Sequence, residues 1–199
     1  MKQTYDLEKL NRLEYFTLDT LRNFVSLNGT SLYKFVMRKV KNGEFIYIRK
    51  GLYVTVKYFE DNNKEVFLEK IANKLKMPSY ISMEYMLSKY SVLSENVFTI
   101  TSITTKKTNV YENSLGRFYY RNIKDNLFEG FVLENKVYRA TKAKALFDFL
   151  YFKTRNTNLK EYRLNLDEFT KADIQEFKKY ILKQPNMYNL YEEMKTYVY

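Results

Sequence analysis

Two short runs of β-forming residues, 45–49 and 52–55, are separated by only two residues, Lys50 and Gly51. β-Branched and aromatic residues favour strands, and a glycine in a two-residue link permits the tight turn of a hairpin. Leucines at helical spacing over residues 7–13 begin a helical region ahead of this hairpin. The first sixty residues are therefore expected to fold as helices followed by a short hairpin.

Further helical patterns occupy the sequence between the leucine-rich start and the hairpin. Thr17 is a suitable N-cap for a helix that stops at Asn28 and Gly29, because these two residues tolerate the left-handed conformation. Thr30 or Ser31 then caps a basic helix that has an apolar stripe along one side. Helix, helix, glycine turn, basic helix and hairpin is the order of a winged helix-turn-helix.

Positive charge is concentrated in the same part of the chain. The 199 residues include 34 Lys and Arg against 23 Asp and Glu, and residues 1–57 hold 11 against 5. Within residues 34–50, six cations accompany a single acid, Glu44. Such an excess predicts a phosphate-binding face, whereas the alternative is the solvated surface of a chain that is basic throughout.

A winged helix-turn-helix contacts DNA in two places. Its second helix enters the major groove with side chains near the N-terminus on base edges, and its hairpin contacts the backbone or the minor groove. The residues predicted to read bases are Ser31, Tyr33, Lys34 and Arg38. The residues predicted to contact phosphates are Lys41, Arg49 and Lys50. Alternatively, these elements only pack into one larger α+β core, which does not require cations opposite the apolar stripe and at the hairpin tip.

A polar stretch at 58–64 predicts the boundary between a winged helix-turn-helix domain over 1–57 and a C-terminal domain over 65–199. Helices in the second part are expected at 65–75, 80–90, 143–152, 171–182 and 189–199. Short strands are expected at 97–101, 109–111, 118–121, 131–133 and 137–139. The helix at 143–152 is apolar nearly all round, so we expect it to be buried against the sheet. The predicted fold class is α+β, with a mainly antiparallel sheet packed by helices.

Several short motifs follow one another in a set order. After Lys50-Gly51-Leu52-Tyr53-Val54 come Pro78-Ser79-Tyr80-Ile81-Ser82, Thr99-Ile100-Thr101, Ala140 and Lys144-Ala145-Leu146-Phe147-Asp148. Over roughly residues 15–155 this order resembles the AbiEi family of antitoxins from type IV abortive-infection toxin–antitoxin systems. The chain departs from the family pattern in two places. Tyr85-Met86 replaces small residues, and Lys142-Ala143 replaces Pro-Glu.

The resemblance implies a protein of two parts. The N-terminal winged helix would bind inverted repeats in double-stranded promoter DNA and repress its own operon. The C-terminal part would antagonise a nucleotidyltransferase-like toxin encoded alongside, without requiring a stable complex between the two proteins. The motif residues assigned to this antitoxin domain are Tyr80, Ser82, Lys144 and Asp148, with Ser79 or Ser82 suited to capping a helix. Lys144 and Asp148 are four residues apart and can pair on one helix face.

The absence of His and Cys excludes imidazole catalysis, cysteine nucleophiles, disulfides and zinc sites built from these residues. We assign no catalytic residue, no metal and no cofactor. One enzymatic alternative is a magnesium-dependent nuclease that uses Glu134 and Lys136 with Asp125 upstream, although a hairpin turn is expected at Asn135. Another alternative is a winged-helix module that binds protein. With no long apolar run and no signal-peptide pattern, a soluble cytoplasmic protein is expected.

Overall fold

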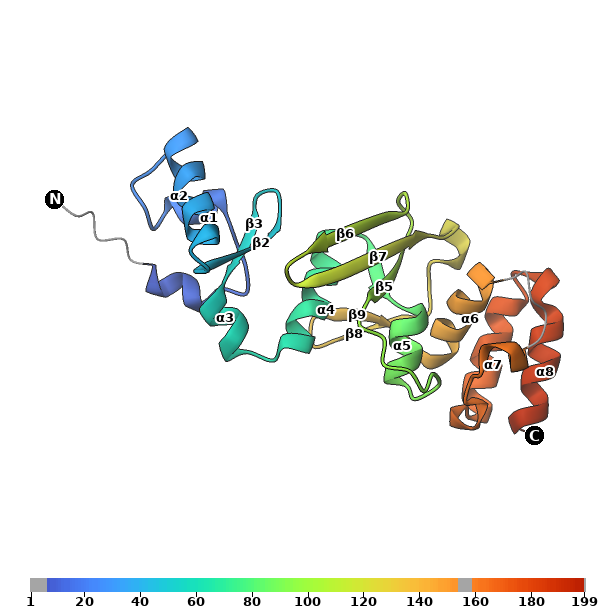
Figure 1. Cartoon of the computed structure of the whole chain (residues 1–199). Coiled ribbons are helices and arrows are strands. Elements are labelled where there is room, and N and C mark those ends of the chain that lie inside the picture. Colours follow the sequence, from blue (N-terminus) through green and yellow to red (C-terminus); the bar gives the residue numbers. More distant parts are fainter. Residues whose placement is uncertain (1–6, 154–158, 199) are drawn as a thin grey trace. The chain divides into compact units, whose positions relative to one another are not determined.

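The computed structural model describes residues 7–153 and 159–198, which combine helices with two β-sheets (Figure 1). By its internal contacts the chain divides into two compact units. The N-terminal unit comprises the described residues up to Leu68 together with Glu112–Gly116, and the C-terminal unit comprises the remainder. The mixture of helix and strand agrees with the predicted α+β class at this coarse level.

The N-terminal unit contains helices and a three-stranded sheet. Its elements in chain order are η1 (a 3₁₀ helix, Glu8–Arg12), β1 (Phe16–Thr17), α1 (Leu18–Arg22), α2 (Gly29–Lys41), β2 (Phe45–Arg49), β3 (Leu52–Thr55), α3 (Val56–Asp61) and the start of α4 (Lys64–Leu75). The strands β2 and β3 pair in antiparallel fashion, which confirms the predicted hairpin. The strand β1 adds to the other side of β3, so the sheet order is β1-β3-β2.

Aromatic side chains from the sheet form the centre of this unit. The Phe16 ring meets Phe45 edge-on at 4.9 Å between centroids and stacks on Tyr53 at 5.9 Å. From α2, Phe35 and Val36 join the same buried cluster. Burying each such side chain contributes roughly 1.5–3 kcal/mol, so the apolar side of α2 is fixed against the sheet and its polar side faces solvent.

Threonine hydroxyls cap two short helices. Thr17 accepts a hydrogen bond from the backbone N–H of Thr20 at 3.2 Å, which confirms its predicted role as the N-cap of α1. Thr55 caps α3 in the same way through the N–H of Tyr58 at 3.1 Å. The prediction of a turn-rich stretch over 58–64 is therefore wrong in its first half, because this cap starts a helix that the polar composition did not indicate.

The boundary between α1 and α2 also differs from the prediction. The helix α1 ends at Arg22, well before the expected stop, and Asn28 is instead the N-cap residue of α2 in an extended conformation. The helix begins at Gly29, so neither Thr30 nor Ser31 caps it. Asparagine and glycine are common at both ends of helices. The Asn28-Gly29 pair therefore indicates a helix boundary, but not whether a helix ends or begins there.

The C-terminal unit is built on a six-stranded sheet with helices around it. Its strands are β4 (Ser79–Ile81), β5 (Ile100–Thr104), β6 (Asn109–Asn113), β7 (Gly116–Asn122), β8 (Phe131–Glu134) and β9 (Val137–Ala140). Its α-helices after α4 are α5 (Met83–Lys89), α6 (Lys142–Lys153), α7 (Lys171–Ile181) and α8 (Tyr188–Val198). Its 3₁₀ helices are η2 (Asp125–Leu127), η3 (Leu159–Tyr162), η4 (Leu166–Glu168) and η5 (Pro185–Met187). None of the helices in the described part of the chain is long and apolar enough to cross a bilayer.

The six-stranded sheet is mixed, and it includes parallel pairs that the prediction of a mainly antiparallel sheet did not foresee. Its order is β6-β7-β5-β4-β9-β8, with β4–β5 and β8–β9 antiparallel but β5–β7 and β4–β9 parallel. The strand β7 returns beside β5, and β6 lies outside it. The chain reverses direction once between β5 and β6 and again between β6 and β7, so β5 and β7 run in the same direction. The sequence shows only that short strands follow one another, and does not show which strands become neighbours.

The region around the proline motif forms a strand before it forms a helix. Tyr80 and Ile81 belong to β4 and pair with Ile103 and Ser102 of β5, so the helix expected from Tyr80 begins only at Met83. The expected strand at 97–101 likewise starts late, at the first residue of β5. Tyr80 and Ile81 are both buried, and pairing with a neighbouring strand overrides a weak local helical pattern.

Different helices cover the two faces of this sheet. Tyr80 reaches Asp148 of α6, whereas Arg139, the β9 partner of Ile81, reaches Glu69 of α4. Because successive side chains of a strand point to opposite faces, α6 and α4 lie on opposite sides of the sheet. The prediction that 143–152 is buried is confirmed for Ala143 through Leu150, and α6 packs between α5 and α7 as well as on the sheet (Figure 1).

We expect Gly130→Ala to lower the free energy of unfolding by about 2–5 kcal/mol, measured by urea denaturation. Gly130 has φ of +73°, and a Cβ there would lie 2.1 Å from the Tyr180 hydroxyl. Gly43→Ala is the matched control, because Gly43 has φ of +70° with open space around it. The control should cost only about 1–2 kcal/mol. Equal losses for both variants would contradict close packing at Gly130.

Candidate nucleic-acid interface

The outward face of α2 carries the residues that were predicted to contact DNA. Ser31, Lys34, Arg38 and Lys41 are exposed, and their spacing of three or four residues places them along one side of the helix. Tyr33, beside them, is 52% exposed, which is unusual for a large aromatic ring. The structure therefore brings the predicted helix residues to the surface opposite the buried stripe.

The one acid in the basic stretch is already paired. Glu44 forms an ion pair with Lys39, a residue that was not assigned to the DNA-reading set. Across residues 7–153 and 159–198, no carboxylate forms an ion pair with Lys34, Arg38 or Lys41. These three cations therefore keep their charge available to an anionic partner.

The hairpin presents a second pair of cations. Arg49 ends β2 and Lys50 occupies the turn, and both are exposed. An irregular register near the tip leaves Ile48 buried as an anchor between exposed neighbours. Gly51 has φ of +76° in open space, which provides the sharp turn that places the two cations at the end of the hairpin.

In the C-terminal unit, the four motif residues meet around one carboxylate. Asp148 accepts hydrogen bonds at Oδ2 from the Tyr80 hydroxyl at 3.0 Å and the Ser82 hydroxyl at 2.7 Å. Its Oδ1 accepts from Lys144 Nζ at 2.7 Å, and the same Nζ donates to the Leu127 carbonyl at 2.8 Å. Tyr80, Ser82, Lys144 and Asp148 are each 0% exposed. We call these four residues the buried cluster.

Burial dominates the electrostatics of the buried cluster. It raises the pKa of Asp148, against the opposing effects of Lys144, Ser82 and Tyr80. Burial, followed by the Asp148 charge, raises the pKa of Tyr80 well above its usual value, so its hydroxyl remains a donor. The Lys144 ammonium also faces the Phe147 and Tyr180 rings, at 4.6 and 5.1 Å from their centroids.

These contacts show what the buried cluster does in the fold. Its side chains are closed to solvent, and they join β4, α6 and η2 instead of lining a reaction site. Ser82 occupies the N-cap position of α5, as predicted, but its hydroxyl donates to Asp148 and makes no capping bond. Ser79, the alternative cap, has a buried hydroxyl with no hydrogen-bond partner among the described residues.

A second buried acid was not identified from the sequence. Glu69 on α4 is 0% exposed and forms ion pairs with Arg139 and with Lys89, the latter at 2.7 Å. The Tyr85 hydroxyl donates to the same carboxylate at 3.1 Å. One feature of the sequence could have identified it, because Glu69 shares the apolar side of its helix with buried residues such as Ala72. A charged residue on such a side is rarely buried unless it is paired.

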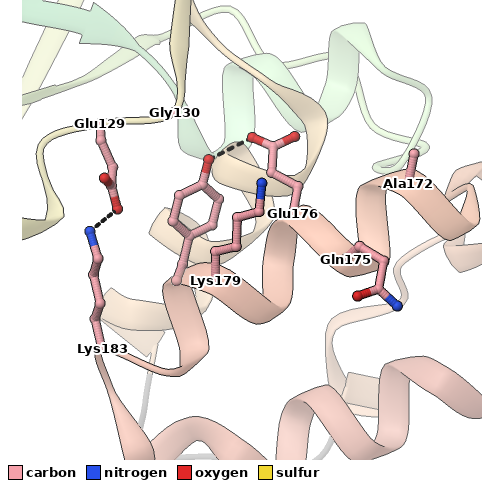
Figure 2. A pocket seen from close by; sticks show the side chains of 8 residues that line it. Glu129, Gly130, Ala172, Gln175, Glu176, Lys179 and Lys183 are labelled. Carbon is pink, nitrogen blue, oxygen red and sulfur yellow. Dashed lines mark hydrogen bonds and ion pairs between the residues drawn. The ribbon is translucent and has the colours of Figure 1, made fainter.

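A pocket of about 650 Å³ lies beside α7. Figure 2 shows Lys183 paired with Glu129. The Tyr180 hydroxyl donates to Glu176. Glu176 also accepts from Thr141 at 2.7 Å. Both carboxylates that line this pocket are therefore already engaged within the protein, Glu129 by a lysine and Glu176 by two hydroxyls.

The residues of the nuclease alternative do not form an obvious centre. Asn135 and Lys136 have φ of +51° and +65° in the turn after β8, which confirms the predicted hairpin turn. Glu134 is exposed at the end of the strand, and Asp125 is exposed in η2. Within the described residues, no group of three or more Asp or Glu side chains comes together at one place.

Neither protein-family models nor curated proteins match this sequence. The functional assignment therefore depends on two features of the molecule itself. One is the exposed set of cations on α2 and the β2–β3 hairpin, and the other is the buried cluster that contains the four motif residues.

We expect Asp148→Ala to destabilise the protein by about 3–5 kcal/mol, because it leaves the Lys144 ammonium buried without its partner. Glu129→Ala is the control, since it removes an exposed ion pair with Lys183 and should cost only about 0–1 kcal/mol. The double variant Lys144→Met/Asp148→Leu should recover much of the loss. Urea denaturation followed by circular dichroism measures all three, and equal losses for Asp148→Ala and Glu129→Ala would contradict the assignment.

Proposed function

We propose that this chain is an antitoxin of the AbiEi type, which represses its own operon by binding promoter DNA and antagonises a nucleotidyltransferase-like toxin. The observation that carries the proposal is the row of cations on the exposed side of α2, which have no carboxylate partner in the described part of the chain. Lys34, Arg38 and Lys41 form this row. A surface that contacts only solvent does not need such a concentration of unpaired charge, whereas a surface that binds a polyanion does.

The order of elements supports the assignment of the N-terminal unit as a winged helix-turn-helix. A helix, a short strand, two further helices and a hairpin follow one another as η1, β1, α1, α2, β2 and β3, and β1 completes the sheet beside β3. In this assignment α2 is the recognition helix and β2–β3 is the wing. With 13 residues, α2 is about 20 Å long, which suits a helix lying in the major groove.

Each predicted residue then has a role in DNA binding. Lys34 and Arg38, with Ser31 and Tyr33 near the start of α2, face the base edges, where Lys and Arg select guanine through its O6 and N7 acceptors. Lys41 at the end of α2 and Arg49 and Lys50 on the wing hold phosphates, which set position without reading sequence. On an inverted repeat, two copies would bind half-sites about one helical turn apart or a multiple of it.

The antitoxin half of the proposal follows from the family resemblance. The motif residues Tyr80, Ser82, Lys144 and Asp148 contact one another, which supports treating them as one unit with a shared role. That role is to hold the fold of the C-terminal unit, and exposed residues of this unit would act on the toxin or its product. In this function the chain works in the cytoplasm, where promoter and toxin are found.

We expect binding to the promoter of its own operon to weaken steeply with salt, with a slope near −0.9 in log affinity against log salt for each phosphate contact. Lys50→Ala should weaken binding to every sequence alike and reduce this slope by about one. Arg38→Ala should cost roughly 1–3 kcal/mol on the specific site and much less on random DNA. Fluorescence anisotropy with labelled duplexes measures both effects.

The control for the DNA experiment is Lys107→Ala, which removes an exposed lysine from the C-terminal unit. This variant should leave affinity and salt slope unchanged. Salt-independent binding, or equal promoter affinity for wild type and Arg38→Ala, would overturn the assignment of the reading face. No DNA binding at all would favour a protein-binding winged-helix module instead, and cleavage of plasmid DNA with magnesium that Glu134→Ala abolishes would favour the nuclease.

The antitoxin activity predicts a second result in cells. The gene next to this one should encode a nucleotidyltransferase-like protein that stops growth when expressed alone, and co-expression of this chain should restore growth. Arg38→Ala should still restore growth while losing repression of a promoter–reporter fusion, because it changes only the DNA-reading face. Failure of the wild-type chain to protect against the neighbouring protein would contradict the antitoxin role without affecting the DNA-binding result.

A further inference from the structure

A second, smaller pocket of about 280 Å³ lies in the C-terminal unit between the sheet and the helices α5 and α6. Strands β5 and β7 form one wall, with Thr99 preceding β5, and the end of α6 forms another. Its volume is just below the range of roughly 300–1,000 Å³ that is usual for ligand pockets. The space therefore suits a compact ligand about the size of a single ring with one substituent.

Arg121 contacts two aromatic rings in this pocket and keeps donors to spare. Its guanidinium carbon lies 4.6 Å from the centroid of the Phe152 ring and 5.5 Å from that of Tyr119. Its Nε donates to the Tyr119 hydroxyl at 3.1 Å. Among the described residues, no other hydrogen bond and no carboxylate partner is found for this guanidinium. The two terminal nitrogens are left to bind a carboxylate or a phosphate, two oxygens of which the guanidinium fork can contact together.

The other charges in the pocket leave it positive. Lys153 forms a loose ion pair with Glu84 at 3.8 Å, with side chains that are 47% and 31% exposed. Since that pair neutralises itself, the Arg121 charge remains uncompensated. Thr99 lines the same space, with no hydrogen bond recorded to another described residue, and its hydroxyl provides a further donor for an oxyanion.

The remaining walls are mainly apolar, although Thr101 also lines the pocket. Met83, Val97 and Phe149 line the pocket, and Phe98, between Val97 and Thr99, is 90% exposed. The pocket thus combines a fixed cation and a hydroxyl with an apolar wall. This combination is typical of sites in which a few polar groups orient a ligand and apolar contacts bind its body.

We propose that this pocket binds a small organic anion, in which a phosphate or carboxylate group is attached to a compact apolar body such as one aromatic ring. The oxyanion contacts the free nitrogens of Arg121 and the Thr99 hydroxyl. The apolar body lies against Met83, Val97 and Phe149. This binding is separate from the DNA-binding and antitoxin functions and does not require either of them.

Isothermal titration calorimetry of the full chain tests this proposal with four probes: phenyl phosphate, benzoate, inorganic phosphate and phenol. We expect phenyl phosphate or benzoate to bind, and the tighter of the two identifies the preferred oxyanion. Phenol should bind far more weakly because it lacks the charge. Inorganic phosphate as tight as phenyl phosphate would show that the apolar wall contributes nothing, and would overturn the proposal. Absence of binding by both phenyl phosphate and benzoate at millimolar concentration would also overturn it.

Variants locate the binding within the pocket. Arg121→Gln should weaken binding of the tighter probe by about 10- to 100-fold, as expected for loss of a charged hydrogen-bonded contact. Arg117→Gln is the matched control, because Arg117 is exposed on the same strand and does not line the pocket. Thr99→Val keeps the side-chain volume and should weaken binding by severalfold. Equal affinities for wild type and Arg121→Gln would overturn the site.

Because Arg121 also packs on Phe152, Arg121→Gln needs a companion measurement that leaves the protein unchanged. The Nε–Hε resonance of Arg121 in the wild-type chain should shift on addition of the tighter probe, while that of Arg117 stays in place. A shift at Arg121 supports the site even if Arg121→Gln fails to fold. An unchanged Arg121 resonance at saturating probe would contradict it.

Discussion

Asp148 accepts hydrogen bonds from three side chains in a space that water does not reach, and this arrangement holds the C-terminal unit together. Tyr80 comes from β4, Ser82 from the start of α5 and Lys144 from α6 itself. Lys144 also donates to the Leu127 carbonyl in η2. A buried ion pair adds little net stability over an apolar replacement, but a displaced partner leaves an uncompensated charge. The buried cluster therefore fixes which positions of the strand, helix and turn face one another.

In the N-terminal unit, by contrast, the charged side chains lie outside the apolar core. Its apolar side chains gather on Phe16, Phe45 and Tyr53, and its cations lie on the outward side of α2 and on the hairpin. The single acid of the basic stretch pairs with Lys39, and among the residues that the structure describes Lys34, Arg38 and Lys41 have no carboxylate partner. Such a surface is costly in self-repulsion for an isolated domain, and a polyanion partner relieves that repulsion. This contrast between the two units underlies the proposed division between DNA binding and antitoxin activity.

Much of the local structure could be predicted because its causes are local. The hairpin at Lys50 and Gly51, the Thr17 cap and the apolar helix α6 each depend on a few adjacent residues, and all three are present. The errors in the C-terminal sheet occurred where distant segments decide. Tyr80 and Ile81 joined β4 because β5 offers hydrogen-bond partners, and β7 inserted between β5 and β6, which made the sheet mixed.

By itself, the sequence determined the helical and strand periodicities, the excess of cations in the first 57 residues and the absence of any imidazole or thiol chemistry. It also showed that Lys144 and Asp148 lie four residues apart, a spacing that equally fits a weak surface pair. Only the tertiary structure placed that pair out of water with Tyr80 and Ser82, and only it placed Arg121 between two aromatic rings. The physical reason is that burial depends on which distant segments pack together. The Lys144–Asp148 pair would contribute little to stability in solvent. Where no water can replace either partner, the same pair fixes which elements of the C-terminal unit pack together.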